Sequence, residues 1–376
     1  MILRQQQEHG FGERPRLVDL FAGPGGLDVA ARWLGIIADG VEWDSGACAT
    51  RRAAGLATRQ ADVRDLGPEF FPAATILAGG PPCQTYTIAG SGAGRRALDQ
   101  VLGFVKRMAI GEDVRPSLET LDDERTALVL EPLRWALRAR ELGRPYQTII
   151  LEQVPAVLPV WEAMEEALEG NGYKTTSGIL NAEEYGVPQT RRRAILIARF
   201  GVTEKPKLPE VTHRRFRKGD SASRGAEDNL LPCVSMGEAL EREDEFVVIS
   251  NYGTGGDPKA RGRRYSHEPA ATVTGKISRN RLKTIDGEDI ARFGIQDAGR
   301  LQTFPHDYPW AGKDVSQQIG NAIPPRLAAH VLAAALGLVL DPKRLDDAVR
   351  GSWHHFDDRR PIATARAVSG REVHTG

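Results

Sequence analysis

Cys83 and Glu152 are the two residues whose type and position are best suited to chemistry. Cys83 follows the rigid segment Gly79-Gly80-Pro81-Pro82, which presents its thiol at the carboxyl end of a predicted strand. A cysteine placed there has no core to fill, and a thiolate is a strong nucleophile near neutral pH. Glu152 ends another apolar run, 148–151, and neighbouring strand ends adjoin in a doubly wound sheet. The pair therefore predicts attack by a thiol beside a carboxyl acid.

A glycine-rich loop follows the first predicted strand. Asp19-Leu20-Phe21 leads into Ala22-Gly23-Pro24-Gly25-Gly26, which brings bare backbone to a place where open α/β sheets bind nucleotide-like ligands. Asp28 stands where a GxGxxG pattern has its third glycine, so a dinucleotide-dependent dehydrogenase is disfavoured. The plainer interpretation of the loop is a tight turn.

Three side chains after this loop suit an adenosine group. Glu42 ends the second predicted strand, where its carboxylate can accept from both ribose hydroxyls. Trp43 can stack on an adenine ring, and Asp62 can accept from its amino group. The plainer interpretation of Glu42 is a charge at a strand end.

The elements that must position these residues alternate as in an α/β fold. The first 200 residues predict helices at 27–34 and 121–142, and strands at 17–21, 36–41, 75–78, 148–151, 173–180 and 193–200. Beyond residue 200 glycines and short strand-like pieces dominate, most clearly at 246–250 and 271–274. A long helix is expected at 325–340. We expect residues 1–200 and 315–342 to form the catalytic and cofactor-binding domain, residues 201–314 a smaller, mostly β domain, and residues 343–376 a poorly ordered polar tail.

Charge and cysteine content narrow the classes of protein. The net charge is zero, but between Arg199 and Lys283 there are 17 Lys and Arg against 12 Asp and Glu, a surplus of 5. A single basic cluster is usually solvated surface, whereas several on one small domain suggest a phosphate-facing surface. Three scattered cysteines without a CxxC pair indicate neither zinc nor disulfides. The start of the chain lacks the apolar region of a signal peptide, and no apolar run is long enough to span a membrane. A cytoplasmic protein is expected.

Five motifs together resemble the cytosine 5-methyltransferase family, in the family's order and over about residues 15 to 340. They are Asp19-Leu20-Phe21-Ala22-Gly23-Pro24-Gly25-Gly26, Gly80-Pro81-Pro82-Cys83-Gln84, Glu152-Gln153-Val154, Tyr185-Gly186-Val187-Pro188-Gln189-Thr190-Arg191-Arg192-Arg193 and Gln318-Ile319-Gly320-Asn321-Ala322-Ile323-Pro324. One departure is Gln153, where the family usually has Asn.

The resemblance implies a Rossmann-like S-adenosylmethionine-dependent methyltransferase domain with a smaller target-recognition domain. It implies that Cys83 is the nucleophile, that Glu152 is the partner of cytosine N3, and that Arg191 and Arg193 complete the catalytic set, the second of them near the cytosine. The expected cofactor-binding residues are Asp19, Phe21, Ala22, Gly23, Gly25, Gly26, Glu42, Trp43, Asp62, Pro82 and Asn321.

The expected reaction transfers a methyl group from S-adenosylmethionine to carbon 5 of a flipped-out cytosine in double-stranded DNA, leaving S-adenosylhomocysteine. Carbon 5 is too weak a nucleophile by itself, and addition of the Cys83 thiolate at carbon 6 with a proton at N3 activates it. No metal is expected. We expect a monomer associated with the nucleoid, with a cognate restriction endonuclease acting separately. The alternatives are an RNA (tRNA) cytosine methyltransferase of the same fold and a catalytically silent DNA-binding regulator.

Overall fold

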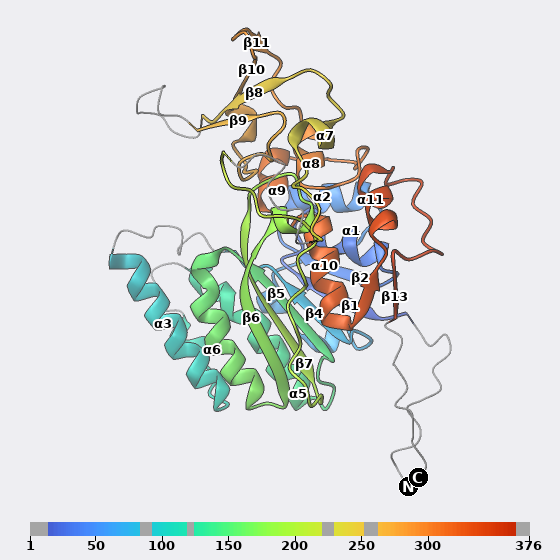
Figure 1. Ribbon diagram of the computed structural model, residues 1–376. Coiled ribbons are helices and arrows are strands. Elements are labelled where there is room, and N and C mark those ends of the chain that lie inside the picture. The colour runs from blue at the N-terminus through green and yellow to red at the C-terminus, as the bar shows by residue number, and fades with distance from the viewer. Residues whose placement is uncertain (1–13, 83–91, 119–123, 220–228, 252–261, 366–376) are drawn as a thin grey trace, which may run out of the picture.

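The fold was analysed in a computed structural model, which describes residues 14–82, 92–118, 124–219, 229–251 and 262–365 (Figure 1). Its centre is a seven-stranded sheet in the order β3-β2-β1-β4-β5-β7-β6. The strands are β1 (Arg16–Leu20), β2 (Ile37–Glu42), β3 (Ala57–Gln60), β4 (Ile76–Gly79), β5 (Thr148–Gln153), β6 (Tyr173–Asn181) and β7 (Arg192–Phe200). Strands β1 to β5 run parallel, and β7 pairs antiparallel with both β5 and β6.

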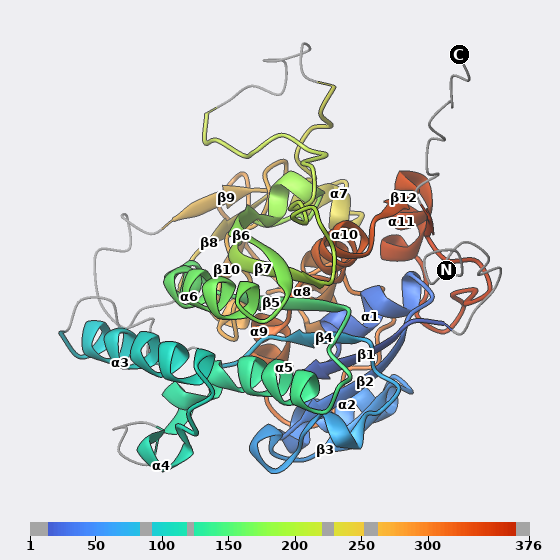
Figure 2. The same ribbon diagram turned by 90° about the horizontal axis from the view of Figure 1, so that it is seen from below.

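Helices cover both faces of this sheet, as they must when central strands are apolar on both sides. Strands β1, β4 and β5 are almost wholly buried. One face packs against α1 (Gly26–Trp33) and α10 (Pro325–Leu336), and the other against α3 (Gly92–Ala109), α5 (Glu131–Glu141) and α6 (Leu158–Glu169) (Figure 2). Helices α2 (Ser45–Ala53) and α4 (Arg115–Leu118) are shorter. The doubly wound α/β architecture expected from the sequence is confirmed.

A second, four-stranded sheet lies apart from the first and has a core of its own (Figure 1). Its order is β11 (Asp289–Ile290), β10 (Arg281–Thr284), β8 (Phe246–Ile249) and β9 (Arg263–Tyr265). Helices α7 (Met236–Leu240), α8 (Ile295–Leu301) and α9 (Val315–Asn321) complete this region. Phe246, Val248 and Leu282 supply its core together with Ile319 of α9, so α9 connects the two halves of the molecule.

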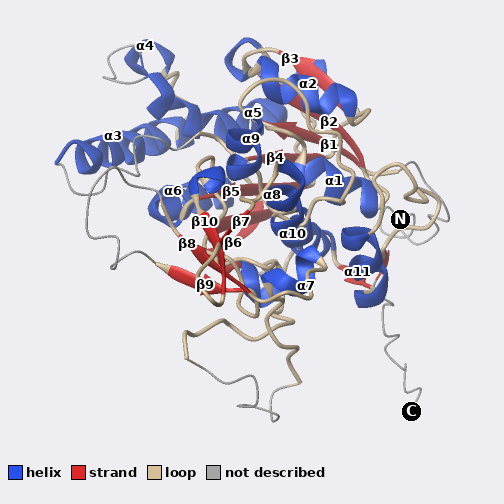
Figure 3. Ribbon diagram, turned by 90° about the horizontal axis from the view of Figure 1, so that it is seen from above, coloured by secondary structure: helices blue, strands red, loops and turns tan. Residues whose placement is uncertain are grey.

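The prediction of a poorly ordered tail is wrong for residues 343–365. Helix α11 (Pro342–Arg350) packs beside α10 (Figure 3), and β13 (Ala363–Ala365) pairs with β12 (Leu338–Leu340). Trp353 is only 2% exposed. The few apolar residues in this polar stretch are spaced so that they reach one core, and average composition hides that spacing.

Three other predicted elements differ from the structure. The helix expected over 325–340 ends at Leu336, because Gly337 adopts a left-handed φ of 67° and caps it. Residues 271–274 form no strand; their neighbour Ala270 makes only an isolated bridge to Gln189. Of the helix expected over 121–142, residues 124–130 form a 3-10 helix and 131–141 form α5, while residues 121–123 lie outside the described parts of the chain.

Candidate active site

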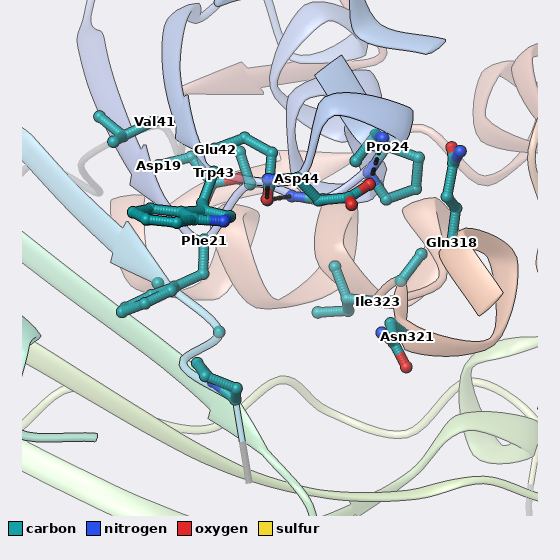
Figure 4. Close-up of a pocket in the computed structure, with 18 of the residues that line it drawn as sticks. Asp19, Phe21, Pro24, Val41, Glu42, Trp43, Asp44, Gln318, Asn321 and Ile323 are labelled. Carbon is teal, nitrogen blue, oxygen red and sulfur yellow. Dashed lines mark hydrogen bonds between the residues drawn. The ribbon is translucent and has the colours of Figure 1, made fainter. Parts of the chain in front are cut away.

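A cavity of about 820 Å³ lies where the carboxyl ends of β1, β2, β4 and β5 meet the end of α9. Figure 4 shows Phe21 and Trp43 at one end of it, with Asn321 and Ile323 opposite. Twelve residues predicted for the site line this cavity: Asp19, Phe21, Ala22, Gly23, Gly26, Glu42, Trp43, Asp62, Pro82, Glu152, Arg193 and Asn321. Cys83 lies outside the described residues, directly after Pro82.

The glycine loop has backbone conformations that residues other than glycine rarely adopt. Gly23 has a φ of 54° and Phe21, unusually for a non-glycine residue, a φ of 60°, the left-handed region that costs energy for L residues. A Cβ on Gly26 would lie 2.2 Å from the Ile323 carbonyl oxygen. Gly25 does not line the cavity; a Cβ there would lie 2.4 Å from the Leu56 side chain, so its glycine serves packing behind the loop.

Glu42 holds the glycine loop and its own strand end together. Its two carboxylate oxygens accept from the Gly23 and Asp44 backbone N–H groups, each at 2.7 Å. Burial raises the pKa of Glu42, although these backbone hydrogen bonds oppose the change. Each oxygen can accept one further hydrogen bond. Trp43 beside it is 68% exposed, so an aromatic face stands open at the cavity.

Asp62 reaches the cavity with its carboxylate already engaged. It caps the 3-10 turn Val63–Asp65 through the Arg64 backbone N–H at 2.8 Å, and it forms an ion pair with the Arg64 guanidinium at 2.7 Å. Burial alone would raise the pKa of Asp62, but the hydrogen bonds from Arg64 outweigh it and lower this pKa. The carboxylate is therefore a fixed acceptor at neutral pH.

Asp19 lies deeper and belongs to a buried charge cluster. Burial and the nearby carboxylate of Asp28 raise the pKa of Asp19 well above its usual value. Asp28 is paired in turn with Arg51, through two hydrogen bonds of 2.8 Å. Gly40 makes room for this arginine, because a Cβ there would lie 1.9 Å from the guanidinium. The cluster supports the glycine loop from behind.

Glu152 occupies the other end of the cavity. Its carboxylate pairs with the Arg193 guanidinium of β7 at 2.6 Å, and both side chains are about nine-tenths buried. A Cβ on Gly80 would lie 3.4 Å from a Glu152 carboxylate oxygen, so Glu152 stands beside the segment that leads to Cys83. The neighbouring Gln153 donates its amide N–H to the Pro81 carbonyl oxygen. The side chain of Gln153, which stands where the family usually has Asn, thus contacts the segment that leads to Cys83.

Arg191 is not brought to the cavity. Its side chain is 1% exposed and donates to the carbonyl oxygens of Val273, Gly320 and Ala322 at 3.0–3.1 Å. Burial and the charge of Arg193 lower the pKa of Arg191. This arginine ties the strand that carries Arg193 to the end of α9 and to the smaller half. The motif supplied the residue type but gave no direction for its side chain.

Several cavity residues were not predicted from the sequence. Gln317 donates its amide N–H to the Asn321 amide oxygen at 2.7 Å, and Gln318 donates to two carbonyls and accepts from Thr50. Gln318 is the first residue of the Asn321 motif and Gln317 directly precedes it, so both were within reach of its pattern. Arg125 and Leu128 also line the cavity, but they lie on a 3-10 helix, Glu124–Leu130, that no strand-end rule would find.

The described residues contain neither a cluster of possible metal ligands nor a helix long and apolar enough to cross a membrane.

Comparison with known proteins matches residues 15–110 and 147–231 to the family described as C-5 cytosine-specific DNA methylase. Among curated relatives, the Type II methyltransferase M1.HphI of Haemophilus parahaemolyticus is 26% identical over 286 residues, which covers 69% of this chain and 68% of the relative. The Type II methyltransferase M.FnuDI of Fusobacterium nucleatum is 25% identical over 370 residues, covering 89% and 98%. Among solved structures, the S. pombe Dnmt2 methyltransferase has a TM-score of 0.59 at 17% identity, covering 86% of this chain and 98% of that one; this likeness concerns the fold.

Proposed function

The chain belongs to the C-5 cytosine-specific DNA methylase family, and we propose that it transfers a methyl group from S-adenosylmethionine to carbon 5 of cytosine in double-stranded DNA through a covalent Cys83 intermediate. One observation carries the proposal: Glu152, paired with Arg193 and beside the segment that leads to Cys83, shares a single cavity with Glu42 and Trp43. A carboxyl group that could protonate a cytosine therefore lies in the same cavity as side chains suited to a nucleoside.

The chemistry of the cavity wall fits S-adenosylmethionine. The Glu42 carboxylate suits the ribose hydroxyls, the open face of Trp43 suits the adenine ring, and Asp62 suits its amino group. The glycine loop leaves room for close approach of the ligand, and Asn321 would face it from the end of α9. When bound, S-adenosylmethionine supplies an electrophilic methyl group and requires no metal ion.

The protein's own residues would activate the cytosine. The Cys83 thiolate adds to carbon 6 while Glu152 holds a proton at N3, so the electron pair of the ring becomes available at carbon 5. Arg193 fixes the Glu152 carboxyl in direction. After methylation a proton acceptor removes the proton from carbon 5, the C6–S bond breaks with release of the Cys83 thiolate, and the proton on N3 returns to Glu152. The base must leave the duplex to enter a cavity of this kind, as in other enzymes that modify bases.

The smaller half would read the DNA. Strands β9 and β10 carry Arg263, Arg264, Arg281 and Lys283, and α9 joins this sheet to the cavity. Arginine and lysine suit both guanine edges and phosphates. We propose that residues 201–314 supply target recognition, and residues 1–200 with 315–342 supply catalysis.

Labelled S-adenosylmethionine tests this function directly. The protein is incubated in parallel with duplex DNA, with the same duplex carrying 5-methylcytosine at every cytosine, and with transfer RNA. Label in the unmodified duplex alone is expected. Label in transfer RNA alone would assign the enzyme to RNA, and label in the fully methylated duplex would show that carbon 5 is not the acceptor.

A further inference from the structure

Tyr308 holds the glycine loop from behind the cavity. Its side chain is fully buried, and its hydroxyl donates to the Pro24 carbonyl oxygen at 2.5 Å. Pro24 lines the cavity, whereas Tyr308 does not. Tyr308 falls within residues 201–314, the predicted smaller domain, and is far from the glycine loop along the chain. A residue that follows α8 therefore fixes the backbone of a loop residue that lines the cavity.

The loop is pressed closely against this tyrosine. A Cβ on Gly25 would lie 3.0 Å from the Tyr308 hydroxyl oxygen, and Gly25 has a φ of 102° that favours glycine. Burial raises the pKa of Tyr308, so the hydroxyl remains a donor. The loop is thus fixed from two sides, at the Gly23 N–H by Glu42 and at the Pro24 carbonyl by Tyr308.

The Tyr308 ring also belongs to an aromatic cluster that joins the two halves of the protein. The ring centroids of Tyr308 and Trp310 are 4.9 Å apart, and those of Tyr308 and Trp353 are 5.4 Å apart. Trp310 packs against both the catalytic core and the core of the smaller sheet. A Cβ on Gly299 of α8 would lie 2.9 Å from the Trp310 indole nitrogen. Packing is therefore continuous from α8 through Trp310 to Tyr308 and the loop.

We propose that Tyr308 is a positioning residue for cofactor binding, delivered to the glycine loop by the segment that follows the recognition sheet. The inference rests on the proposed use of S-adenosylmethionine. Loss of the hydroxyl would free the Pro24 carbonyl and let the loop depart from its binding conformation. The dissociation constant for S-adenosylhomocysteine and the KM for S-adenosylmethionine should then rise about 2- to 10-fold, the range of one neutral hydrogen bond. The kcat at saturation and the KM for DNA should change by less than about twofold, since Tyr308 touches neither reacting group.

Tyr185 provides a closely matched control for the variant Tyr308→Phe. It is 1% exposed, belongs to the same hydrophobic core, and donates its hydroxyl to the Pro209 carbonyl oxygen at 2.9 Å. Neither Tyr185 nor Pro209 lines the cavity. Tyr185→Phe therefore removes the same kind of hydrogen bond at a comparable cost in stability. Calorimetry with S-adenosylhomocysteine, steady-state kinetics and thermal unfolding are measured for both variants and for the wild-type protein.

The expected result is a similar loss of thermal stability in both variants, with weaker cofactor binding in Tyr308→Phe alone. Equal affinity of Tyr308→Phe and the wild-type protein, or an equal loss in Tyr185→Phe, would overturn the inference. A wild-type protein that binds no S-adenosylhomocysteine would instead overturn the proposed function.

Hydrogen exchange on the wild-type protein tests the same contact without a variant. S-adenosylhomocysteine should slow exchange in residues 304–310 as well as in residues 22–29. Protection of 22–29 alone would contradict the role of Tyr308.

Discussion

Glu42 and Glu152 are both carboxylates at strand ends, yet their surroundings give them different tasks. Glu42 accepts two backbone N–H groups and orders the glycine loop. Glu152 faces a guanidinium and stands beside the segment that leads to Cys83. The rule that functional residues follow strands found both of them. It could not find Arg125, which lies on a 3-10 helix. The family motif, for its part, placed Arg191 wrongly, because a motif fixes residue type and not side-chain direction.

Glu152→Gln should reduce kcat by about 10²- to 10⁴-fold, since the amide has no acidic proton for N3. Binding of S-adenosylhomocysteine should stay within about threefold of wild type. Glu131→Gln is the matched control, because Glu131 is also buried and pairs with an arginine, Arg134, at 2.7 Å, but lies outside the cavity. Single-turnover methylation measures both variants. A Glu152→Gln enzyme as fast as the Glu131→Gln enzyme would remove Glu152 from the mechanism.

Glu42→Ala and Asp62→Ala should each weaken the binding of S-adenosylhomocysteine by about 1.5–3 kcal/mol, the range for a hydrogen bond to a charged group. DNA affinity should change less. Asp65→Ala serves as control, because Asp65 is exposed on the same turn as Asp62. Calorimetry that finds all three variants equal to wild type would show that the cofactor lies elsewhere.

At the scale of elements, the strands with apolar runs were predictable, and those that depend on pairing were not. Strand β3 has the sequence Ala57-Thr58-Arg59-Gln60, which carries no apolar run, and it forms because β2 offers it an edge. Helix α11 and strand β13 escaped prediction because their few apolar residues are buried only through contacts with distant parts of the chain, such as α10 and β12. The expected helix end at 340 failed because Gly337 stops α10.

Two buried histidines near Arg326 of α10 make stability depend on pH. Burial, together with Arg326, lowers the pKa of His330 to about 3 and that of His213 to about 4. Tyr185 packs on the His330 ring, and Asp346 pairs with Arg326. Because these pKa values are depressed, the unfolded chain takes up protons first as pH falls below about 6.5, and stability is lost until pH reaches about 4 and then 3. The loss is at most about 1.4 kcal/mol per pH unit for each histidine.

Chemical unfolding at pH 7.5, 6 and 5 measures this dependence. His330→Phe should reduce the dependence by about half, because His213 still contributes, and His354→Phe should leave it unchanged, since His354 is exposed. An equal slope in His330→Phe and wild type would show that His330 is not the group responsible.

At the scale of the whole molecule, the sequence predicted two regions with different textures, and the structure contains two sheets with separate cores. Their connection was not predictable, because it depends on single side chains such as Arg191 and Tyr308 that reach across from one region to the other. Catalysis and recognition are therefore proposed for different sheets that share α9 and one aromatic cluster.

Exchanging residues 202–263 for the equivalent segment of a relative with a different target tests this division. Bisulfite sequencing of DNA methylated by the chimera should report the target of the segment's donor. An active chimera that keeps the target of the parent supplying the first 200 residues would place specificity outside this segment.

Covalent trapping shows whether Cys83 attacks cytosine. Duplex DNA carrying 5-fluorocytosine at the target position is incubated with the protein and S-adenosylmethionine, because fluorine cannot leave carbon 5 as a proton does. Mass spectrometry of the digested complex should then find the methylated base bonded to Cys83, and Cys83→Ser should form no complex. An adduct at Cys48 or Cys233, or release of methylated DNA without any adduct, would contradict the account.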